Sequence, residues 1–193
     1  MKILVCDRLD EKVLNKFEEI GEITNISESK TKMEDLKSNI VDTDIVVIRS
    51  GTKINKDILE NANNLKIIAR CGVGVDNVDV EEATNKKIYV TNSPNANIIS
   101  VAELTIGLII SAARKIHISN NSLKDKKWDR NKFLGTELYQ KQLGLVGFGK
   151  AAKEVAKRLS AFGMNIVFYD PYVDSSTIEA KKVALDELLR TSD

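Results

Sequence analysis

The first half of the chain alternates short apolar runs with longer stretches in which apolar residues recur at helical spacing. The apolar runs are residues 2–7, 22–26, 45–50, 66–71 and 88–92. The stretches with helical spacing are residues 10–20, 33–40, 56–62 and 80–85. Strands and helices that alternate in this order form parallel βαβ units, so the pattern predicts a single α/β domain over residues 1–94.

Two helix starts in this domain carry capping signals. Asp10 precedes the first helical stretch directly. Thr31 precedes the second, and Glu34 follows it three residues later, which is the spacing of a capping box. We expect both helices to begin with a side chain that accepts a hydrogen bond from a first-turn N–H group.

The second half of the chain begins after Pro94, because a proline disfavours helical geometry in the residue before it. Residues 97–115 are apolar on most helical faces and predict a long helix buried between domains or subunits. A polar amphipathic segment, residues 116–128, and a loop, residues 129–140, follow. The rest reads as a strand, a glycine turn, a helix and a second strand. We therefore predict a second domain over residues 95–193.

The glycine turn of the second domain carries the most specific chemical signal in the chain. Gly147 and Gly149 follow an apolar run, and Ala152 takes the third position of the Gly-x-Gly-x-x-Ala pattern. Gly147 allows the sharp turn from strand to helix, and Gly149 lets a pyrophosphate approach the backbone. A helix that begins near Lys150 directs its free N–H groups at the phosphates. A helix-packing turn is the alternative reading of these glycines.

A carboxylate ends the second strand of this unit. Asp170 lies 18 residues after Ala152, where a carboxylate accepts hydrogen bonds from the ribose hydroxyls and repels a 2′-phosphate. The sequence therefore predicts NAD, rather than NADP, as the cofactor. Lys150 has two open assignments, a contact to the diphosphate or a solvated lysine in the first helical turn.

A second glycine cluster follows the fourth predicted strand. Arg70, Gly72 and Gly74 place an arginine and exposed backbone amides at the carboxyl end of that strand, the edge where open α/β sheets bind ligands. Amides together with an arginine suit a carboxylate ligand. The alternative is a tight turn capped by Asp76 and Asn77.

Two further arginines complete a candidate anion site. Arg49 ends the third predicted strand at the same edge, and Arg130 follows the only tryptophan. Each could instead be a solvated surface charge or a salt-bridge partner. His117, the only histidine, falls at the end of the long predicted helix. We interpret it as a core histidine or as one at the carboxyl end of the helix, near the negative pole of the helix dipole, rather than as a catalytic base.

Composition narrows the class of protein. With 193 residues and a net charge of +1, the chain offers no global electrostatic argument for binding nucleic acid or an anionic membrane. No apolar run reaches the roughly 20 residues that a membrane-spanning helix needs. Cys6 and Cys71 lack metal-ligand spacing, and we expect no metal site. Buried, reduced thiols at these two positions fit a cytoplasmic protein.

Several stretches of the chain together resemble the D-isomer-specific 2-hydroxyacid dehydrogenases. They are residues 49–50, 70–79, 91–95, 102–105, 127–130, 133–138 and 144–152. The resemblance implies a flavodoxin-like substrate-binding domain over residues 1–94, followed by the first part of a Rossmann-type nucleotide-binding domain over residues 95–193. It also implies hydride transfer between NAD and a small 2-hydroxyacid. In the branch that the chain resembles most, the substrate is 3-phosphoglycerate, oxidised in the first step of serine biosynthesis.

The resemblance assigns cofactor contacts to single residues. Lys150, Ala151 and Asp170 fall on contacts to the diphosphate and the ribose. Val73 falls on the loop that meets both the nicotinamide and the substrate carboxylate. We also expect the protein to form a homo-oligomer, a dimer or a tetramer.

The resemblance also assigns substrate contacts. Gly74 shares the carboxylate loop, and Arg70 lies beside it. Arg49 and Arg130 fall on arginines implicated in binding the phosphate-bearing substrate. Residue 51 is a glycine where some relatives carry another arginine, which leaves a glyoxylate or hydroxypyruvate reductase as an alternative. A non-catalytic NAD-binding module is a third possibility.

The resemblance places the catalytic residues outside this chain. Family members carry a catalytic arginine, a carboxylate and a histidine acid/base further along than residue 193, and His117 matches none of them. Hydride transfer from a hydroxyl carbon needs a group that moves the hydroxyl proton. We therefore expect a truncated chain that does not turn over substrate by itself and that holds only two strands of the nucleotide sheet.

Overall fold

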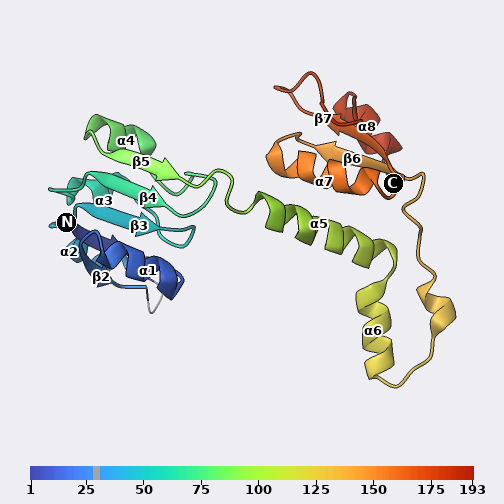
Figure 1. The fold of residues 1–193 in the computed structure, drawn as a ribbon, viewed down its shortest axis with the longest axis horizontal. Helices are drawn as coiled ribbons and strands as arrows, with labels where there is room; N and C mark the ends of the chain where they lie inside the picture. The colour runs from blue at the N-terminus through green and yellow to red at the C-terminus, as the bar shows by residue number, and fades with distance from the viewer. Residues whose placement is uncertain (28–30) are drawn as a thin grey trace. The chain divides into compact units, whose positions relative to one another are not determined.

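The computed structural model describes residues 1–27 and 31–193. The chain divides into two compact units, Met1–Asn97 and Ile98–Asp193, which are drawn in Figure 1. Each unit has its own parallel sheet and its own buried core, so each is described separately.

The first unit is built on a five-stranded parallel sheet with the strand order β2-β1-β3-β4-β5. Its strands are β1 (Lys2–Val5), β2 (Glu22–Asn25), β3 (Ile45–Ile48), β4 (Ile67–Arg70) and β5 (Tyr89–Asn92). This is the flavodoxin-like order, in which the chain reverses direction across the sheet between β1 and β3. The predicted strands and the predicted α/β class are confirmed; β1 to β4 end one or two residues earlier than their apolar runs, and β5 ends with its run at Asn92.

Helices cover both faces of this sheet because strand residues alternate between its two sides. They are α1 (Glu11–Glu18), α2 (Met33–Ile40), α3 (Lys56–Glu60) and α4 (Val80–Asn85). Leu4, Val46 and Ile68 belong to a buried cluster that also holds the apolar residues of α2, α3 and α4. The intervening residues Ile3, Val5 and Val47 form a cluster with α1 on the other face.

One of the two predicted helix caps is correct. The Asp10 side chain accepts a hydrogen bond from the backbone N–H of Lys12 at 2.9 Å and caps α1. Thr31 does not cap α2, which begins after Lys32 without a side-chain cap. The Thr31 hydroxyl instead donates to the Cys6 carbonyl at 2.5 Å, so it satisfies a backbone acceptor at the end of β1.

The second unit begins with two helices, α5 (Ile98–Ala113) and α6 (Ile116–Lys124), separated by a left-handed Lys115 with φ 54°. A 3-10 turn, η1 (Arg130–Phe133), lies within the predicted loop. The α5 helix packs against α7 (Lys150–Ser160), but only Ala102 of α5 is fully buried. The helix therefore buries one stripe within this unit and exposes Ile99, Val101, Leu104 and Leu108.

The sheet of the second unit has three parallel strands in the order β6-β7-β8. They are β6 (Gln142–Val146), β7 (Asn165–Tyr169) and β8 (Lys181–Lys182), and α8 (Leu185–Thr191) follows. The expectation of two strands was wrong, because β8 contains two lysines and has no apolar signature; its backbone pairs with Val167 and Phe168. The order matches one half of a Rossmann sheet.

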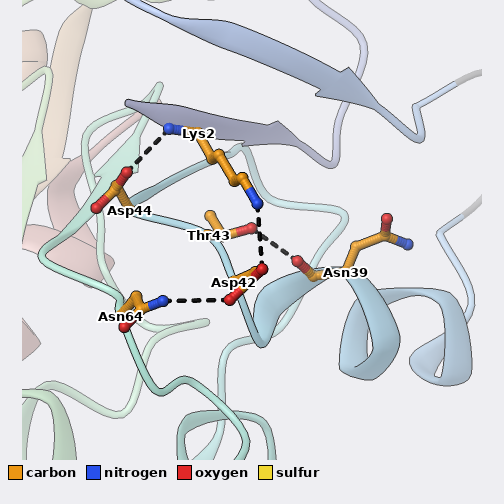
Figure 2. Close-up of polar contacts among 6 residues, drawn as sticks. All are labelled: Lys2, Asn39, Asp42, Thr43, Asp44 and Asn64. Carbon is orange, nitrogen blue, oxygen red and sulfur yellow. Dashed lines mark hydrogen bonds and ion pairs between the residues drawn. The ribbon is translucent and has the colours of Figure 1, made fainter.

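The amino ends of the strands in the first unit are joined by a polar cluster (Figure 2). Asp44 accepts hydrogen bonds from the Lys2 backbone N–H at 2.9 Å and from the Lys66 ammonium at 2.7 Å. The Lys2 ammonium reaches Asp42 at 3.1 Å, and Asp42 also accepts from Asn64 at 3.3 Å. These contacts connect the starts of β1, β3 and β4 at the edge opposite to the glycine cluster.

Among the helices in the described part of the chain, none has the length and apolarity needed to cross a bilayer.

Asp44 gives a pH-dependent prediction for stability. The hydrogen bond from Lys66 and that from the Lys2 backbone lower the pKa of Asp44 below its usual value. The ionised form is therefore favoured in the folded state, and its stabilising contribution is present above the unfolded-state pKa and lost as pH falls through the folded-state pKa. We expect Asp44→Asn to lower the melting temperature at neutral pH. The deficit should shrink below about pH 4.

Thermal unfolding followed by circular dichroism from neutral pH to about pH 2.5 measures this difference. Glu60→Gln, a carboxylate loss at an exposed position of α3, is the matched control and should behave as wild type. A deficit of Asp44→Asn that stays constant down to the lowest pH would contradict the assignment.

Candidate nucleotide and substrate sites

The glycine turn of the second unit lies between β6 and α7. Gly147 has φ +89°, a left-handed conformation that a residue with a side chain adopts only with strain. Its N–H donates to the Tyr169 carbonyl at 2.7 Å, which ties the turn to the end of β7. The predicted role of Gly147 in the strand-to-helix turn therefore has a direct conformational basis.

The turn is held against β7 by a stacked pair of aromatic rings, Phe148 and Phe168. Phe148, between the two glycines, is fully buried, and its ring stacks on Phe168 of β7 with centroids 3.9 Å apart and an interplanar angle of 16°. Ala152 packs against the same cluster, in the position where the pattern requires a small residue. Packing therefore holds the turn against β7, with Gly149 at the start of α7.

The Asp170 carboxylate also fixes the turn, through hydrogen bonds that it accepts from backbone N–H groups. One carboxylate oxygen, Oδ2, accepts from the Phe148 N–H at 2.7 Å, and the other, Oδ1, accepts from the Tyr172 and Val173 N–H groups at 2.8 and 3.1 Å. The bond from Phe148 is the main reason that the pKa of Asp170 is lowered, with the bond from Tyr172 next. Sequence reasoning assigned Asp170 to the ribose and missed that it also joins the end of β7 to the turn after β6.

The start of α7 is suited to an anion. Gly149 is the N-cap residue and supplies no side-chain acceptor, and a Cβ built on it meets no atom within 4 Å. Lys150 and Ala151 are the first residues of the helix, with Lys150 exposed and Ala151 half-buried. First-turn N–H groups without a side-chain cap, together with the helix dipole, make this end a phosphate-binding position.

The second glycine cluster lies at the carboxyl end of β4. Asn92 Nδ2 donates to the Val73 carbonyl at 2.7 Å, and the Ser93 N–H donates to the Gly72 carbonyl at 2.8 Å. The N–H groups of Val73 and Gly74 have no hydrogen-bond partner among the described residues. The end of β5 therefore holds the carbonyls of this loop and leaves two amides available to a carboxylate.

Arg70 packs across this loop. A Cβ built on Gly72 would lie 1.9 Å from Arg70 Nη1, so the loop needs a glycine at this position to keep the guanidinium in place. The Nε atom of Arg70 is buried and has no partner within the part of the chain that the structure describes. The guanidiniums of Arg70 and Arg49 partly oppose the rise that burial causes in the pKa of the Cys71 thiol.

Arg49 follows β3 at the same edge of the sheet and is exposed. Its Nη1 donates to the Arg8 carbonyl at 3.4 Å. A hollow of about 920 Å³ opens here, at the point where the strand order reverses, and Arg8, Lys12 and Arg49 are among the side chains that line it. Open α/β sheets bind ligands at this reversal point.

The structure revises the turn-capping alternative for the second glycine cluster. Asn77 is buried, and its side chain does not cap its own turn but reaches the loop after β3. Asp7, at the end of β1, also bonds to that loop. Sequence reasoning missed Asp7 because an aspartate after a strand has no distinctive spacing.

The remaining predicted residues lie in the second unit. Arg130 is exposed at the start of η1, beside Trp128, which is 78% exposed. Its convergence with Arg49 and Arg70 stays a prediction. His117 is exposed in the first turn of α6, so the interpretation as a core or carboxyl-end histidine was wrong; the helix breaks at Lys115, before this residue.

Both cysteines are free thiols, and burial raises the pKa of Cys6 to about 12. Within the described residues, no group of three or more His, Cys, Asp or Glu side chains is arranged to hold a metal ion.

Comparison with known proteins matches nearly the whole chain to one family. The model of the D-isomer specific 2-hydroxyacid dehydrogenase catalytic domain matches residues 3–190. D-3-phosphoglycerate dehydrogenase of Methanocaldococcus jannaschii is 49% identical over 197 residues, which cover 100% of this chain and 37% of that protein. Hydroxypyruvate reductase of Thermotoga maritima is 43% identical, covering 100% of this chain and 62% of that protein.

A solved structure shows the same fold with a bound nucleotide. NAD-dependent formate dehydrogenase from Staphylococcus aureus in complex with NAD matches with a TM-score of 0.86 and 26% identity, covering 100% of this chain and 63% of that one. NAD, the cofactor predicted from the glycine turn, is consistent with this family. The chain thus spans a little over a third to just under two thirds of the length of these relatives.

Proposed function

This chain belongs to the D-isomer-specific 2-hydroxyacid dehydrogenase family, and from that premise we propose that it supplies the NAD-binding turn and the substrate-binding loops of a D-3-phosphoglycerate dehydrogenase. The observation that carries the proposal is the turn at Gly147–Gly149, which is fixed by Phe148 and Asp170 while the start of α7 has no side-chain cap. Its relative from Methanocaldococcus jannaschii supports the choice of substrate.

The dinucleotide contacts follow from the turn. The N–H groups at the start of α7, in Lys150 and Ala151, face the diphosphate in this proposal. Asp170 stays ionised, because three backbone N–H groups lower its pKa, and the one lone-pair site that remains, on Oδ2, accepts from a ribose hydroxyl in this proposal. The same negative charge disfavours the 2′-phosphate of NADP.

The substrate contacts are divided between two kinds of donor. The amides of Val73 and Gly74, with Arg70 beside them, receive the carboxylate of the 2-hydroxyacid. Arg49 and Arg130 receive the phosphate, since a guanidinium binds phosphate oxygens through paired N–H groups. NAD, when bound, takes the hydride from the 2-hydroxyl carbon. The hydroxyl proton needs an acceptor, and we expect a histidine outside these 193 residues to accept it.

A specific observation favours the second candidate, a hydroxypyruvate or glyoxylate reductase. A Cβ built on Gly51 would lie 2.5 Å from Asp7 Oδ1, so an arginine at this position requires Asp7 to move. The chain therefore presents fewer cations to a phosphate than the relatives that carry an arginine here. The hydroxypyruvate reductase from Thermotoga maritima is similar over the whole chain.

The substrate assignment is tested with the full-length gene product. We expect NADH formation with 3-phosphoglycerate and NAD, and a KM that rises about tenfold or more in Arg49→Ala, because a phosphate loses a charged hydrogen-bond donor. We expect no turnover by the 193-residue chain alone. Absorbance at the NADH band measures both. Turnover of hydroxypyruvate or glyoxylate without any of 3-phosphoglycerate would establish the second candidate instead.

The cofactor assignment is tested at Asp170. We expect Asp170→Asn to weaken NAD binding and to reduce the preference for NAD over NADP by at least about tenfold, because it removes the charge that repels the 2′-phosphate. Titration calorimetry with each nucleotide measures the ratio. Asp174→Asn, a loss of charge at a nearby side chain that is 94% exposed, is the control and should leave the ratio unchanged. An unchanged ratio in Asp170→Asn would refute the assignment.

We also propose that the protein is a homo-oligomer that covers the exposed stripe of α5. Leu104 and Leu108 are 64% and 61% exposed and lie one helical turn apart on the same face. Apolar residues that remain exposed together in this way mark a contact surface. We expect the double variant Leu104→Glu, Leu108→Glu to reduce the mass measured by light scattering to that of a single chain. Leu189→Glu, at an equally exposed leucine of α8, is the control, and equal masses for both variants would contradict the proposal.

A further inference from the structure

The four-residue loop after β3, Arg49–Thr52, is held at both ends by one carboxylate. Asp7 Oδ2 accepts from the Arg49 N–H at 2.6 Å and from the Thr52 N–H at 3.2 Å. Asp7 lies two residues after the end of β1, the strand next to β3 in the sheet, and 42 residues before Arg49. A single oxygen atom thus fixes the first and last N–H groups of the loop.

The carbonyls of the same two residues are held by one carboxamide. Asn77 Nδ2 donates to the Arg49 carbonyl at 2.7 Å and to the Thr52 carbonyl at 2.5 Å. Arg49 and Thr52 therefore have both backbone polar groups bonded to side chains from distant segments. This arrangement fixes the Arg49 backbone more completely than a turn stabilised by its own hydrogen bonds.

The loop is not arranged for maximum stability. Thr52 Oγ1 and Asn77 Oδ1 are buried and have no hydrogen-bond partner within the described part of the chain. A buried polar atom without a partner destabilises the folded state. Such groups persist where geometry matters more than stability, which is a common property of functional sites.

We call the hydrogen bonds from Asp7 and Asn77 to the backbone of Arg49 and Thr52 the clamp. The clamp also joins two candidate substrate loops. Asn77 lies three residues after Gly74, whose loop presents the amides at the end of β4. Because Asn77 bonds to the loop after β3, the position of Arg49 is coupled to the position of the Val73 and Gly74 amides. An acid that carries a carboxylate at one end and a phosphate at the other needs both groups at a fixed separation.

We propose that Asp7 and Asn77 are positioning residues that fix Arg49 relative to the Gly72–Gly74 loop for a substrate bearing both a carboxylate and a phosphate. The inference rests on the proposed function. Asp7 also disfavours a side chain at residue 51, because a Cβ on Gly51 would lie 2.5 Å from its Oδ1 and Asp7 would have to move. The pair Asp7 and Gly51 therefore sets how many cations the loop presents, and so contributes to the choice between phosphorylated and unphosphorylated acids.

The test uses a conservative pair of variants in the full-length protein. Both N–H groups bond to the same oxygen of Asp7, so Asp7→Asn can keep both hydrogen bonds, whereas Asp7→Ala removes both. We expect Asp7→Ala to raise the KM for 3-phosphoglycerate about tenfold with a smaller change in kcat, and Asp7→Asn to restore most of the loss. Asp57→Ala, which removes an exposed carboxylate paired with Lys37, should leave KM unchanged.

A double-mutant cycle separates positioning from a purely structural role. If Asp7 acts through Arg49, Asp7→Ala should add little to the KM of Arg49→Ala, whereas independent effects multiply. Multiplied effects on KM would overturn the positioning role. Asn77→Ala should behave as Asp7→Ala does.

A second readout does not depend on turnover. Hydrogen exchange at the Arg49 and Thr52 amides should accelerate in Asp7→Ala and not in Asp7→Asn, and titration with inorganic phosphate should shift the Arg49 guanidinium resonances less in Asp7→Ala than in wild type. If the wild-type enzyme does not turn over 3-phosphoglycerate, the proposed function fails while these measurements still decide on the clamp. Unchanged exchange in Asp7→Ala, or no phosphate response in wild type, would overturn the inference.

Discussion

In both units, an aspartate at the end of one strand accepts backbone N–H groups from the loop that follows the neighbouring strand. Asp7 does so for the loop after β3, and Asp170 does so for the turn after β6. At the carboxyl edge of a parallel sheet, the loop N–H groups leave the ladder and need acceptors. A carboxylate supplies a charged acceptor, and the hydrogen bond that results is stronger than one between neutral groups.

Fixing a loop in this way leaves other amides available for a ligand. At the turn, Phe148 and Asp170 hold the backbone while the start of α7 has no side-chain cap. At the second glycine cluster, Asn92 and Ser93 hold the carbonyls, and the amides of Val73 and Gly74 are unpaired among the described residues. Donors that are already oriented bind an anion without the cost of reorganising the loop.

The two ends of the strands in the first sheet differ in how their polar groups are paired. At the amino ends of the strands, Asp44 accepts from the Lys2 backbone N–H, as Figure 2 shows, and also pairs with the Lys66 ammonium, which connects the starts of β1, β3 and β4. At the carboxyl edge, the buried Arg70 Nε, Thr52 Oγ1 and Asn77 Oδ1 have no partner in the described structure. The polar groups at the amino ends of the strands are therefore paired with one another, whereas the three unpaired buried atoms lie at the carboxyl ends, beside the candidate substrate loops.

The sequence determined the strands and helices of the first unit and the strand–turn–helix–strand order around Gly147, because apolar periodicity and the steric demands of glycine act over a few residues. Gly147 could be assigned from its spacing alone, and its φ of +89° supplies the reason. Only the tertiary structure placed the two-lysine β8, which lacks an apolar signature and pairs through its backbone. Only the tertiary structure also gave Asp7, Asn77 and the second role of Asp170, because their partners lie 22 to 45 residues away and are backbone groups that no side-chain pattern reveals.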